Sequence, residues 1–293
     1  MDPEGRMDGA TVLVTGGNAG VGLATARGLA RLGARVVITA RDPAKGETAA
    51  DEVRAAAPGA AVEVLDLDLA SFASIRRCAD EVQRRVEHLD VLINNAGLVQ
   101  TQYRLTENGF ETTFGVNHLG HFLLTTLLVD HLRASAPARV VVVASRAHQG
   151  ARDGLDFDDL QSERLYRPIT AYNRSKLANI YFTRELARRL AGTGVTANSL
   201  HPGFVASRLG RDGDGGTAGA VVMVLARPFA ISPTRGARTS IYLASSPAVA
   251  TTTGEYFAHC RPAKPARIAT DDAAARRLWE LSEALVAAPP DRG

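Results

Sequence analysis

The sequence predicts a single doubly wound α/β fold, in which one parallel sheet carries helices on both faces. Short apolar runs alternate along the chain with longer segments whose apolar residues recur at helical spacing. The runs are apolar at consecutive positions, which is typical of strands that are buried on both faces and therefore of a parallel sheet. Short connections and right-handed crossovers then give the doubly wound arrangement.

The elements follow one another in a regular order. A short apolar run that two glycines end predicts the first strand, and apolar residues at helical spacing up to Gly33 predict the helix after it. The same alternation continues to a last helix that is rich in Arg and Ala. The expected strands are residues 11–15, 35–40, 62–67, 91–93, 140–143 and 195–200. The expected helices are residues 20–32, 43–57, 72–86, 114–132, 171–190 and 271–287.

The chain shows neither a Pro/Ser-rich linker nor an internal repeat. Residues 1–293 are therefore expected to form one domain, although the length alone would also allow two. A Gly-rich stretch at 210–216 lies beyond a strand end, where α/β sheets bind ligands. This favours a substrate loop over approximately 204–235, and a solvated loop without a role is the alternative.

The composition excludes several classes of function. Lys and Arg number 34 against 31 Asp and Glu, and no block of five or six basic residues predicts a nucleic-acid partner. Two cysteines cannot build a disulfide framework or a four-thiolate metal site. No signal peptide is evident, and no apolar run approaches the ~20 residues that span a bilayer. We expect a cytoplasmic protein that acts on a small molecule.

A glycine-rich turn joins the first expected strand to the first expected helix. Its glycines are Gly16, Gly20 and Gly22. Residues without a Cβ let the chain turn sharply, and the helix N-terminus offers free N–H groups and a positive dipole end to a pyrophosphate. Glycines also mark ordinary turns, but the place of these three between strand and helix favours a dinucleotide site.

The end of the second strand bears on the choice of cofactor. An acidic side chain there would bind the ribose 2′-hydroxyl of NAD and repel the 2′-phosphate of NADP. The chain instead has Thr39 and Ala40, followed by Arg41, whose guanidinium could pair with that phosphate. We therefore expect NADP(H) to be favoured over NAD(H). The alternative is that Arg41 is a surface residue paired with Asp42 or Glu47.

Tyr172 and Lys176 lie four residues apart at the start of an expected helix, so they share one face. A free tyrosine has a pKa near ~10, and a nearby cation favours the phenolate. This makes Tyr172 a candidate general acid/base.

Ser145 lies past the fifth expected strand and could bind a substrate oxygen or cap a helix. Asn117, in an otherwise apolar helix, is expected to be a structural bridge or part of a proton relay.

His118 and His121 are three residues apart on the same helix. Without an evident third ligand, we expect them to pack in the core and predict no metal site.

These motifs together resemble the short-chain dehydrogenase/reductase family. The segments 116–124 and 175–179 are similar to its retinol-dehydrogenase-like branch. The matching features span about two-thirds of the chain and occur in the order of the family. They are Thr15-Gly16-x3-Gly20-x-Gly22, Asp68, Asn94-Asn95-Ala96-Gly97, Asn117, Ser145, Tyr172-x3-Lys176 and His201-Pro202-Gly203.

The resemblance implies a Rossmann-type sheet and a role for each catalytic residue. Tyr172 would exchange a proton with the substrate oxygen, and Lys176 would lower the pKa of Tyr172 and hold the nicotinamide ribose. Ser145 would orient the substrate oxygen, and Asn117 would hold a water that links Lys176 to solvent. The implied cofactor contacts are Thr15, Gly16, Asn18, Gly20, Val21, Gly22, Arg41, Asp68, Leu69, Asn95, Ala96, Gly97, Tyr172, Lys176, Pro202 and Gly203.

We therefore expect an NADP(H)-dependent oxidoreductase that interconverts a carbonyl and an alcohol. The expected substrate is a small to medium apolar aldehyde, ketone or alcohol, such as a retinoid-like compound or a secondary metabolite. Many members of the branch carry an N-terminal membrane anchor, whereas the first strand here is expected within about ten residues of the start. The resemblance also implies a homodimer or homotetramer. The alternatives are a catalytically silent regulator or scaffold of the same fold, and an epimerase or dehydratase that acts on nucleotide sugars.

Overall fold

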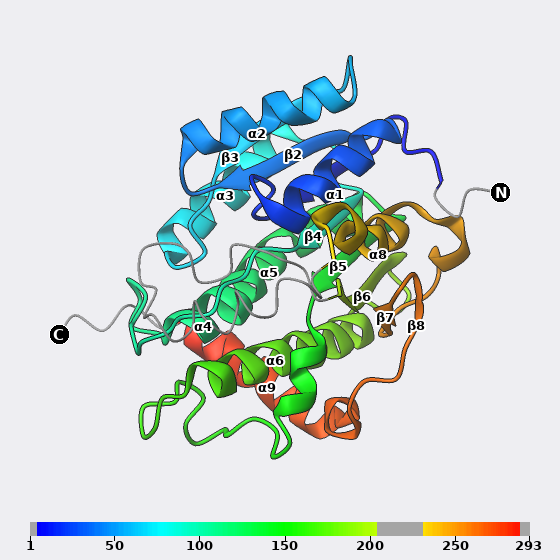
Figure 1. Ribbon diagram of the computed structural model, residues 1–293. Coiled ribbons are helices and arrows are strands. Elements are labelled where there is room, and N and C mark those ends of the chain that lie inside the picture. The colour runs from blue at the N-terminus through cyan, green and yellow to red at the C-terminus, as the bar shows by residue number, and fades with distance from the viewer. Residues whose placement is uncertain (1–4, 204–230, 288–293) are drawn as a thin grey trace.

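The computed structural model describes residues 5–203 and 231–287. Within these ranges eight strands form one sheet in the order β3-β2-β1-β4-β5-β6-β7-β8 (Figure 1). All neighbouring pairs are parallel except the last, β7 with β8. The strands are β1 (Thr11–Val14), β2 (Arg35–Ala40), β3 (Val62–Asp66), β4 (Val91–Asn94), β5 (Ala138–Val143), β6 (Val195–His201), β7 (Tyr256–Ala258) and β8 (Arg261–Pro262).

Helices cover both faces of this sheet (Figure 1). The α-helices are α1 (Gly20–Arg31), α2 (Pro43–Ala56), α3 (Phe72–Arg85), α4 (Thr112–Phe114), α5 (Gly120–Ala134), α6 (Pro168–Arg189), α8 (Pro233–Ser245) and α9 (Asp272–Ala287). A π-helical turn, Gly115–Leu119, joins α4 to α5. Short 3-10 turns occupy Arg146–Gly150, Pro247–Val249 and Arg267–Thr270. No helix of the described residues combines the length and the apolar character that a membrane crossing requires.

Alternation along the strands divides the core into two layers. Leu13 packs into the layer formed with α3, α5, α6 and α9, whereas its neighbours Val12 and Val14 pack into the layer formed with α1, α2 and α8. Successive side chains of a strand point to opposite faces, so both faces need apolar residues. The predicted doubly wound sheet with helices on both faces is therefore confirmed.

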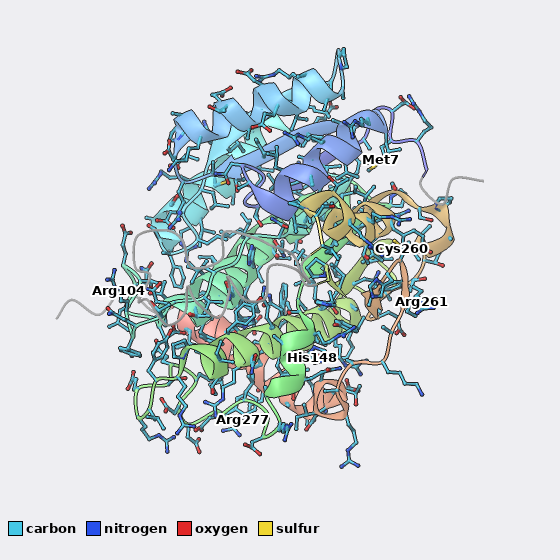
Figure 2. All side chains as sticks on the ribbon, in the orientation of Figure 1. Met7, Arg104, His148, Cys260, Arg261 and Arg277 are labelled. Carbon is cyan, nitrogen blue, oxygen red and sulfur yellow. The ribbon has the colours of Figure 1, made fainter. Side chains whose placement is uncertain are left out.

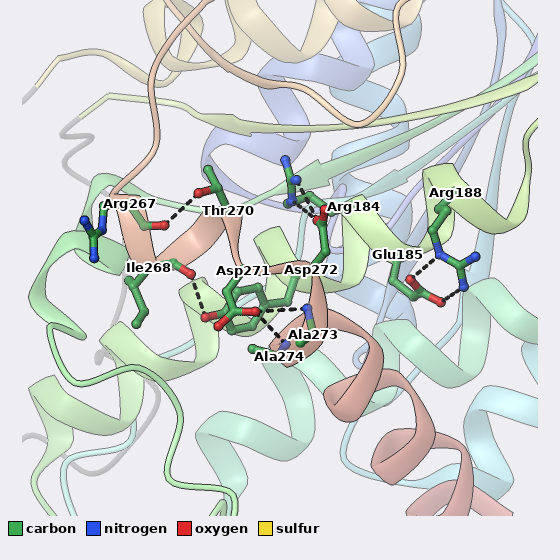
Figure 3. A network of polar contacts seen from close by, with 11 residues as sticks. Arg184, Glu185, Arg188, Arg267, Ile268, Thr270, Asp271, Asp272, Ala273 and Ala274 are labelled. Atoms are coloured by element: carbon green, nitrogen blue, oxygen red, sulfur yellow. Dashed lines mark hydrogen bonds and ion pairs between the residues drawn. The ribbon is translucent and has the colours of Figure 1, made fainter.

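The C-terminal helix α9 lies outside α6 and is held to it by polar contacts (Figure 3). The Asp271 carboxylate accepts hydrogen bonds from the backbone N–H groups of Ala273 and Ala274 and so begins the helix. Arg184 of α6 reaches Asp272 at 2.7 Å. Trp279 stacks on Phe182, with ring centroids 5.8 Å apart. These contacts add α9 to one face of the sheet as an outer layer.

The observed elements differ from the expected ones in three places. The expected continuous helix 114–132 is interrupted by the π-helical turn. Helix α8 and the strands β7 and β8 are not among the expected elements, and the two strands are only three and two residues long. Most of the expected substrate loop at 204–235 lies outside the described residues, and residues 233–235 begin α8.

Candidate functional site

The site lies where the strand order reverses. β1 pairs with β2 on one side and with β4 on the other, so the crossovers leave the sheet in opposite directions there. In open α/β sheets, ligands bind beyond the carboxyl ends of the strands at this point. Most of the sequence-predicted residues follow the carboxyl ends of β1 to β6, so the fold brings these segments to one edge of the sheet, whereas Tyr172 and Lys176 lie on α6.

The glycine turn between β1 and α1 fits a phosphate group. Gly16 has φ +63°, a conformation that favours glycine. A Cβ at Gly22 would lie 2.3 Å from the Gly16 carbonyl oxygen and 2.5 Å from Asn95 Nδ2. Ala19 at the N-cap of α1 makes no side-chain capping hydrogen bond, in contrast to Asp42, which caps α2. The first N–H groups of α1 are thus left without a capping side chain, as anion binding requires.

Thr15 joins this turn to the end of β4. Its Oγ1 accepts hydrogen bonds from the backbone N–H groups of Asn95 at 2.8 Å and Ala96 at 3.0 Å. Asn95 Nδ2 in turn donates to the Thr15 carbonyl oxygen at 2.8 Å. The two loops that the sequence predicts to hold the cofactor, 15–22 and 95–97, are therefore one hydrogen-bonded unit.

Asn117 lies in the π-helical turn, a distortion that is frequent at functional sites. Its Oδ1 accepts from the Leu98 N–H at 2.8 Å, and its Nδ2 donates to the Leu98 carbonyl at 2.9 Å. Nδ2 also lies 3.0 Å from Ser175 Oγ on α6. Asn117 thus bridges the segment after Gly97 to the helix that carries Tyr172 and Lys176.

Lys176 is buried on the inner face of α6, with 3% of its surface exposed. Its Nζ donates to the Val143 carbonyl at 3.0 Å and lies 5.7 Å from the centroid of the Tyr172 ring. Burial lowers the pKa of Lys176 to about 8. Among the described residues, no carboxylate forms an ion pair with this ammonium.

Tyr172 differs from the sequence-based expectation in the direction of its pKa. Burial raises the pKa of Tyr172, and a hydrogen bond with Ser145 acts more weakly in the opposite direction. Lys176 is not among the groups that shift this pKa, and desolvation of the phenolate acts in the direction opposite to the expected lowering. The phenol is therefore protonated at neutral pH.

Ser145 caps a helix, as one of the two sequence-based alternatives expects, and it also interacts with Tyr172. It begins the 3-10 turn Arg146–Gly150, and its Oγ accepts from the Ala147 N–H at 3.1 Å. The same side chain hydrogen-bonds Tyr172. Ser145, Tyr172, Lys176 and Asn117 consequently form one connected group at the carboxyl ends of β4 and β5.

Comparison with known proteins agrees with this arrangement. The family model described as short chain dehydrogenase matches residues 10–156, half of the chain. The chain belongs to the short-chain dehydrogenase family. Human retinol dehydrogenase 14 is 49% identical over 306 residues, which cover 97% of this chain and 88% of that protein. Human retinol dehydrogenase 13 is 45% identical over 286 residues, with 95% and 85% covered. The predicted resemblance to the retinol-dehydrogenase-like branch is confirmed.

Solved structures show the same fold. A protein from Mycobacterium paratuberculosis has a TM-score of 0.77 and 37% identity, and the match covers 98% of this chain and 97% of that one. The Pseudomonas aeruginosa RhlG/NADP active-site complex has a TM-score of 0.70 and 30% identity, with 88% and 97% covered. The fold of a short-chain dehydrogenase binds a nicotinamide cofactor, and the glycine turn and uncapped α1 of this chain fit one.

The remaining predicted cofactor residues of this short-chain dehydrogenase lie around the same edge. Asp68 and Leu69 follow β3, and the Asp68 carboxylate accepts from the Ala70 N–H at 2.9 Å. Pro202 and Gly203 follow β6 directly. Arg41 is exposed after β2. Asn18 is half-buried in the glycine turn, and Val21 lies in the first turn of α1.

Sequence reasoning missed three histidine roles in this short-chain dehydrogenase. His121, expected only to pack, hydrogen-bonds Thr15 Oγ1 at 2.9 Å and the Asn117 carbonyl at 3.2 Å. His148 and His201 contact the backbone beside Ser145. A sequence signal existed only for His201, which adjoins Pro202. His118 instead contacts Ser282 of α9 at 2.9 Å.

Proposed function

We propose that the protein is an NADP(H)-dependent oxidoreductase that interconverts a carbonyl and an alcohol, with Tyr172 as general acid/base. The observation that carries the proposal is the connected group of Ser145, Tyr172, Lys176 and Asn117 beside the glycine turn. Such a group combines a proton donor, a cation and a hydroxyl at the edge where α/β sheets bind ligands.

The nicotinamide cofactor supplies the hydride when it is bound, and the side chains supply position and electrostatics. The Thr15–Asn95 unit and the open N-terminus of α1 would hold its phosphates. Lys176, with Nζ fixed on the Val143 carbonyl, would hold the ribose with its remaining N–H groups. Ser145 Oγ would donate to the substrate oxygen and hold it next to the Tyr172 hydroxyl.

The protonation state of Tyr172 suits carbonyl reduction. Because burial raises its pKa, the phenol carries a proton that it can give to the developing alkoxide. The phenolate that remains would be stabilised by the Lys176 ammonium, 5.7 Å from the ring centroid. In alcohol oxidation the same group would have to lose its proton first, at a cost that burial increases.

Arg41 supports the proposed preference for NADP(H). Arg41 directly follows β2, next to the strand end where an acidic residue would bind the 2′-hydroxyl of NAD. The strand end also adjoins the glycine turn, because Thr39 Oγ1 accepts a hydrogen bond from the Gly16 N–H at 3.3 Å. At this place the Arg41 guanidinium could pair with the 2′-phosphate through charge-assisted hydrogen bonds.

Arg41→Ala is expected to raise the dissociation constant of NADPH about 10-fold or more, since a charge-assisted hydrogen bond contributes roughly 1.5–3 kcal/mol. Binding of NADH should change less than 2-fold. Fluorescence titration of both cofactors measures this, with Arg31→Ala at the far end of α1 as the control. Equal weakening of both cofactors, or tighter binding of NADH by the unaltered protein, would contradict the proposed preference.

Apolar side chains near Tyr172 favour an apolar substrate. Ile169 lies three residues before Tyr172 on α6, a spacing that places both side chains on one face of the helix, and it is 67% exposed. Leu165, just before the helix, is 64% exposed. The names of the relatives specify retinol, and we propose a retinoid-like or other small to medium apolar aldehyde, ketone or alcohol.

NADPH oxidation measured against a panel of apolar aldehydes and ketones tests the function. Turnover of at least one panel member is expected, and alcohols of the same skeletons should be oxidised with NADP. Binding of NADPH without turnover of any member, in either direction, would reject the oxidoreductase and favour a silent cofactor-binding regulator.

A further inference from the structure

One peptide group beside the catalytic serine is bound by a histidine at each end. The Ser145 carbonyl and the Arg146 N–H are the two polar groups of the same planar unit. His148 Nδ1 lies 2.6 Å from the Ser145 carbonyl oxygen. On the other side, the Arg146 N–H donates to His201 Nδ1 at 3.1 Å. Figure 2 marks His148, which lies on the turn that follows β5.

The partners determine which ring nitrogen of each histidine carries its proton. A carbonyl only accepts, so His148 must donate from Nδ1. His148 Nε2 is then bare, which agrees with its acceptance of the Ala266 N–H at 3.0 Å. His201 accepts at Nδ1 and therefore carries its proton on Nε2. The two imidazoles are thus neutral and of opposite tautomer.

Their surroundings keep both rings neutral. His148 has no exposed surface and His201 is 9% exposed. Burial lowers the pKa of His148, and burial together with the charge of Arg146 lowers the pKa of His201 to about 4. The ring of Tyr256 packs on His148 with centroids 5.2 Å apart. Protonation of His201 would place a donor opposite the Arg146 N–H and break that contact.

We propose that His148 and His201 are positioning residues that clamp the 145–146 peptide and thereby aim the Ser145 hydroxyl at Tyr172. The clamp rests on the proposed function only for its effect on turnover. It joins three segments that are remote in sequence: the turn after β5, the end of β6, and residue 266 before α9. Because the orientation of that peptide sets where the Ser145 side chain points, loss of either contact should loosen the hydroxyl.

The tautomers test the clamp without any need for activity. Two-dimensional ¹⁵N NMR of histidine-labelled protein at pH 7 should show His148 protonated at Nδ1 and His201 at Nε2, each assigned by loss of its signals in a substituted variant. The reverse tautomer at either residue, or a charged ring, would overturn the clamp even if the protein proved not to be an enzyme.

Matched substitutions separate the clamp from a structural role. In His148→Asn the amide nitrogen replaces Nδ1 and keeps the donor to Ser145, whereas in His148→Gln the amide replaces Nε2 and keeps only the acceptor for Ala266. In His201→Asn the amide oxygen replaces Nδ1 and keeps an acceptor for the Arg146 N–H, whereas in His201→Gln the amide replaces Nε2 and this acceptor is lost. Each Gln variant should lower kcat about 10- to 100-fold and each Asn variant less than 5-fold, since small misplacements of reacting groups have effects of this size. The opposite order, or equal losses, would show that the histidines only support the fold.

A double-mutant cycle identifies the residue through which the clamp acts. In the Ser145→Ala background, His148→Gln should lower kcat by less than 2-fold further, because the group that it positions is gone. The melting temperature and the dissociation constant of NADPH should shift equally in both backgrounds. A full additional loss in the Ser145→Ala background would overturn the clamp. If Ser145→Ala alone leaves kcat unchanged, the proposed catalytic role of Ser145 fails instead, and the NMR result still decides the geometry.

Discussion

Replacement of Tyr172 by Phe is expected to lower kcat for carbonyl reduction by ~10²–10⁴, the usual contribution of a positioned proton donor. The substitution removes one oxygen from a half-buried ring, so the packing of α6 is retained. The hydrogen bond with Ser145 is lost with it. The KM for NADPH should change little, because the substitution leaves Lys176 and the phosphate-binding turn between β1 and α1 in place. Steady-state kinetics with NADPH and the best panel substrate measure the effect.

Tyr181→Phe is the matched control for this loss. Tyr181 lies on the same helix, is fully buried, and donates from its hydroxyl to the Ile268 carbonyl at 2.8 Å. Its removal should lower the melting temperature while kcat stays within about 2-fold. A Tyr172→Phe variant with undiminished turnover would reject Tyr172 as the proton donor, and equal losses of kcat in both variants would assign the effect to α6 rather than to the phenol.

The fold was predictable because the sheet is buried on both faces. Strands such as Val36–Ile38 are apolar at every position, and a glycine follows the ends of helices such as α1 and α6. The elements that were missed lack those signals. β8 has two residues, and the π-helical turn has no distinct pattern, since Val116 and Leu119 also fit an α-helix.

The candidate site residues could be brought together from the sequence because most of their motifs follow strand ends, and a doubly wound sheet gathers those ends at one edge. The supporting contacts could not. His148 and His201 bind backbone groups, and a backbone contact leaves no trace in the type of its partner. The pKa of Tyr172 was misjudged for a related reason. Spacing on a helix predicts the neighbouring cation, but burial, which decides the direction, is a property of the tertiary structure.

Acidification between pH 6.5 and 5 is expected to destabilise the protein strongly. Burial lowers the pKa of His118 to about 3 and that of His121 and His201 to about 4. An unfolded histidine has a pKa near ~6.5, so in this window the unfolded state binds more protons than the folded state. The free energy of unfolding therefore decreases as the pH is lowered. At ~1.4 kcal/mol per pH unit and histidine, the three together contribute a loss of roughly 6 kcal/mol at pH 5. This is comparable to the whole stability of a typical domain, ~5–15 kcal/mol.

Equilibrium unfolding in urea, measured at several values of pH from 7 to 5, tests this expectation. His118→Phe should flatten the dependence by about a third, because one of the three neutral imidazoles is gone. The phenyl ring would pack among Phe114, Phe122 and Phe182, which surround His118. His88→Gln, at a side chain with 64% exposure, should leave the slope unchanged.

Since the depressed pKa values belong to the folded state, stability is fully present above pH 6.5 and is lost as the pH falls towards 4. A slope that stayed flat from pH 7 to 5, or that was the same in His118→Phe, would show that these rings take up protons without unfolding.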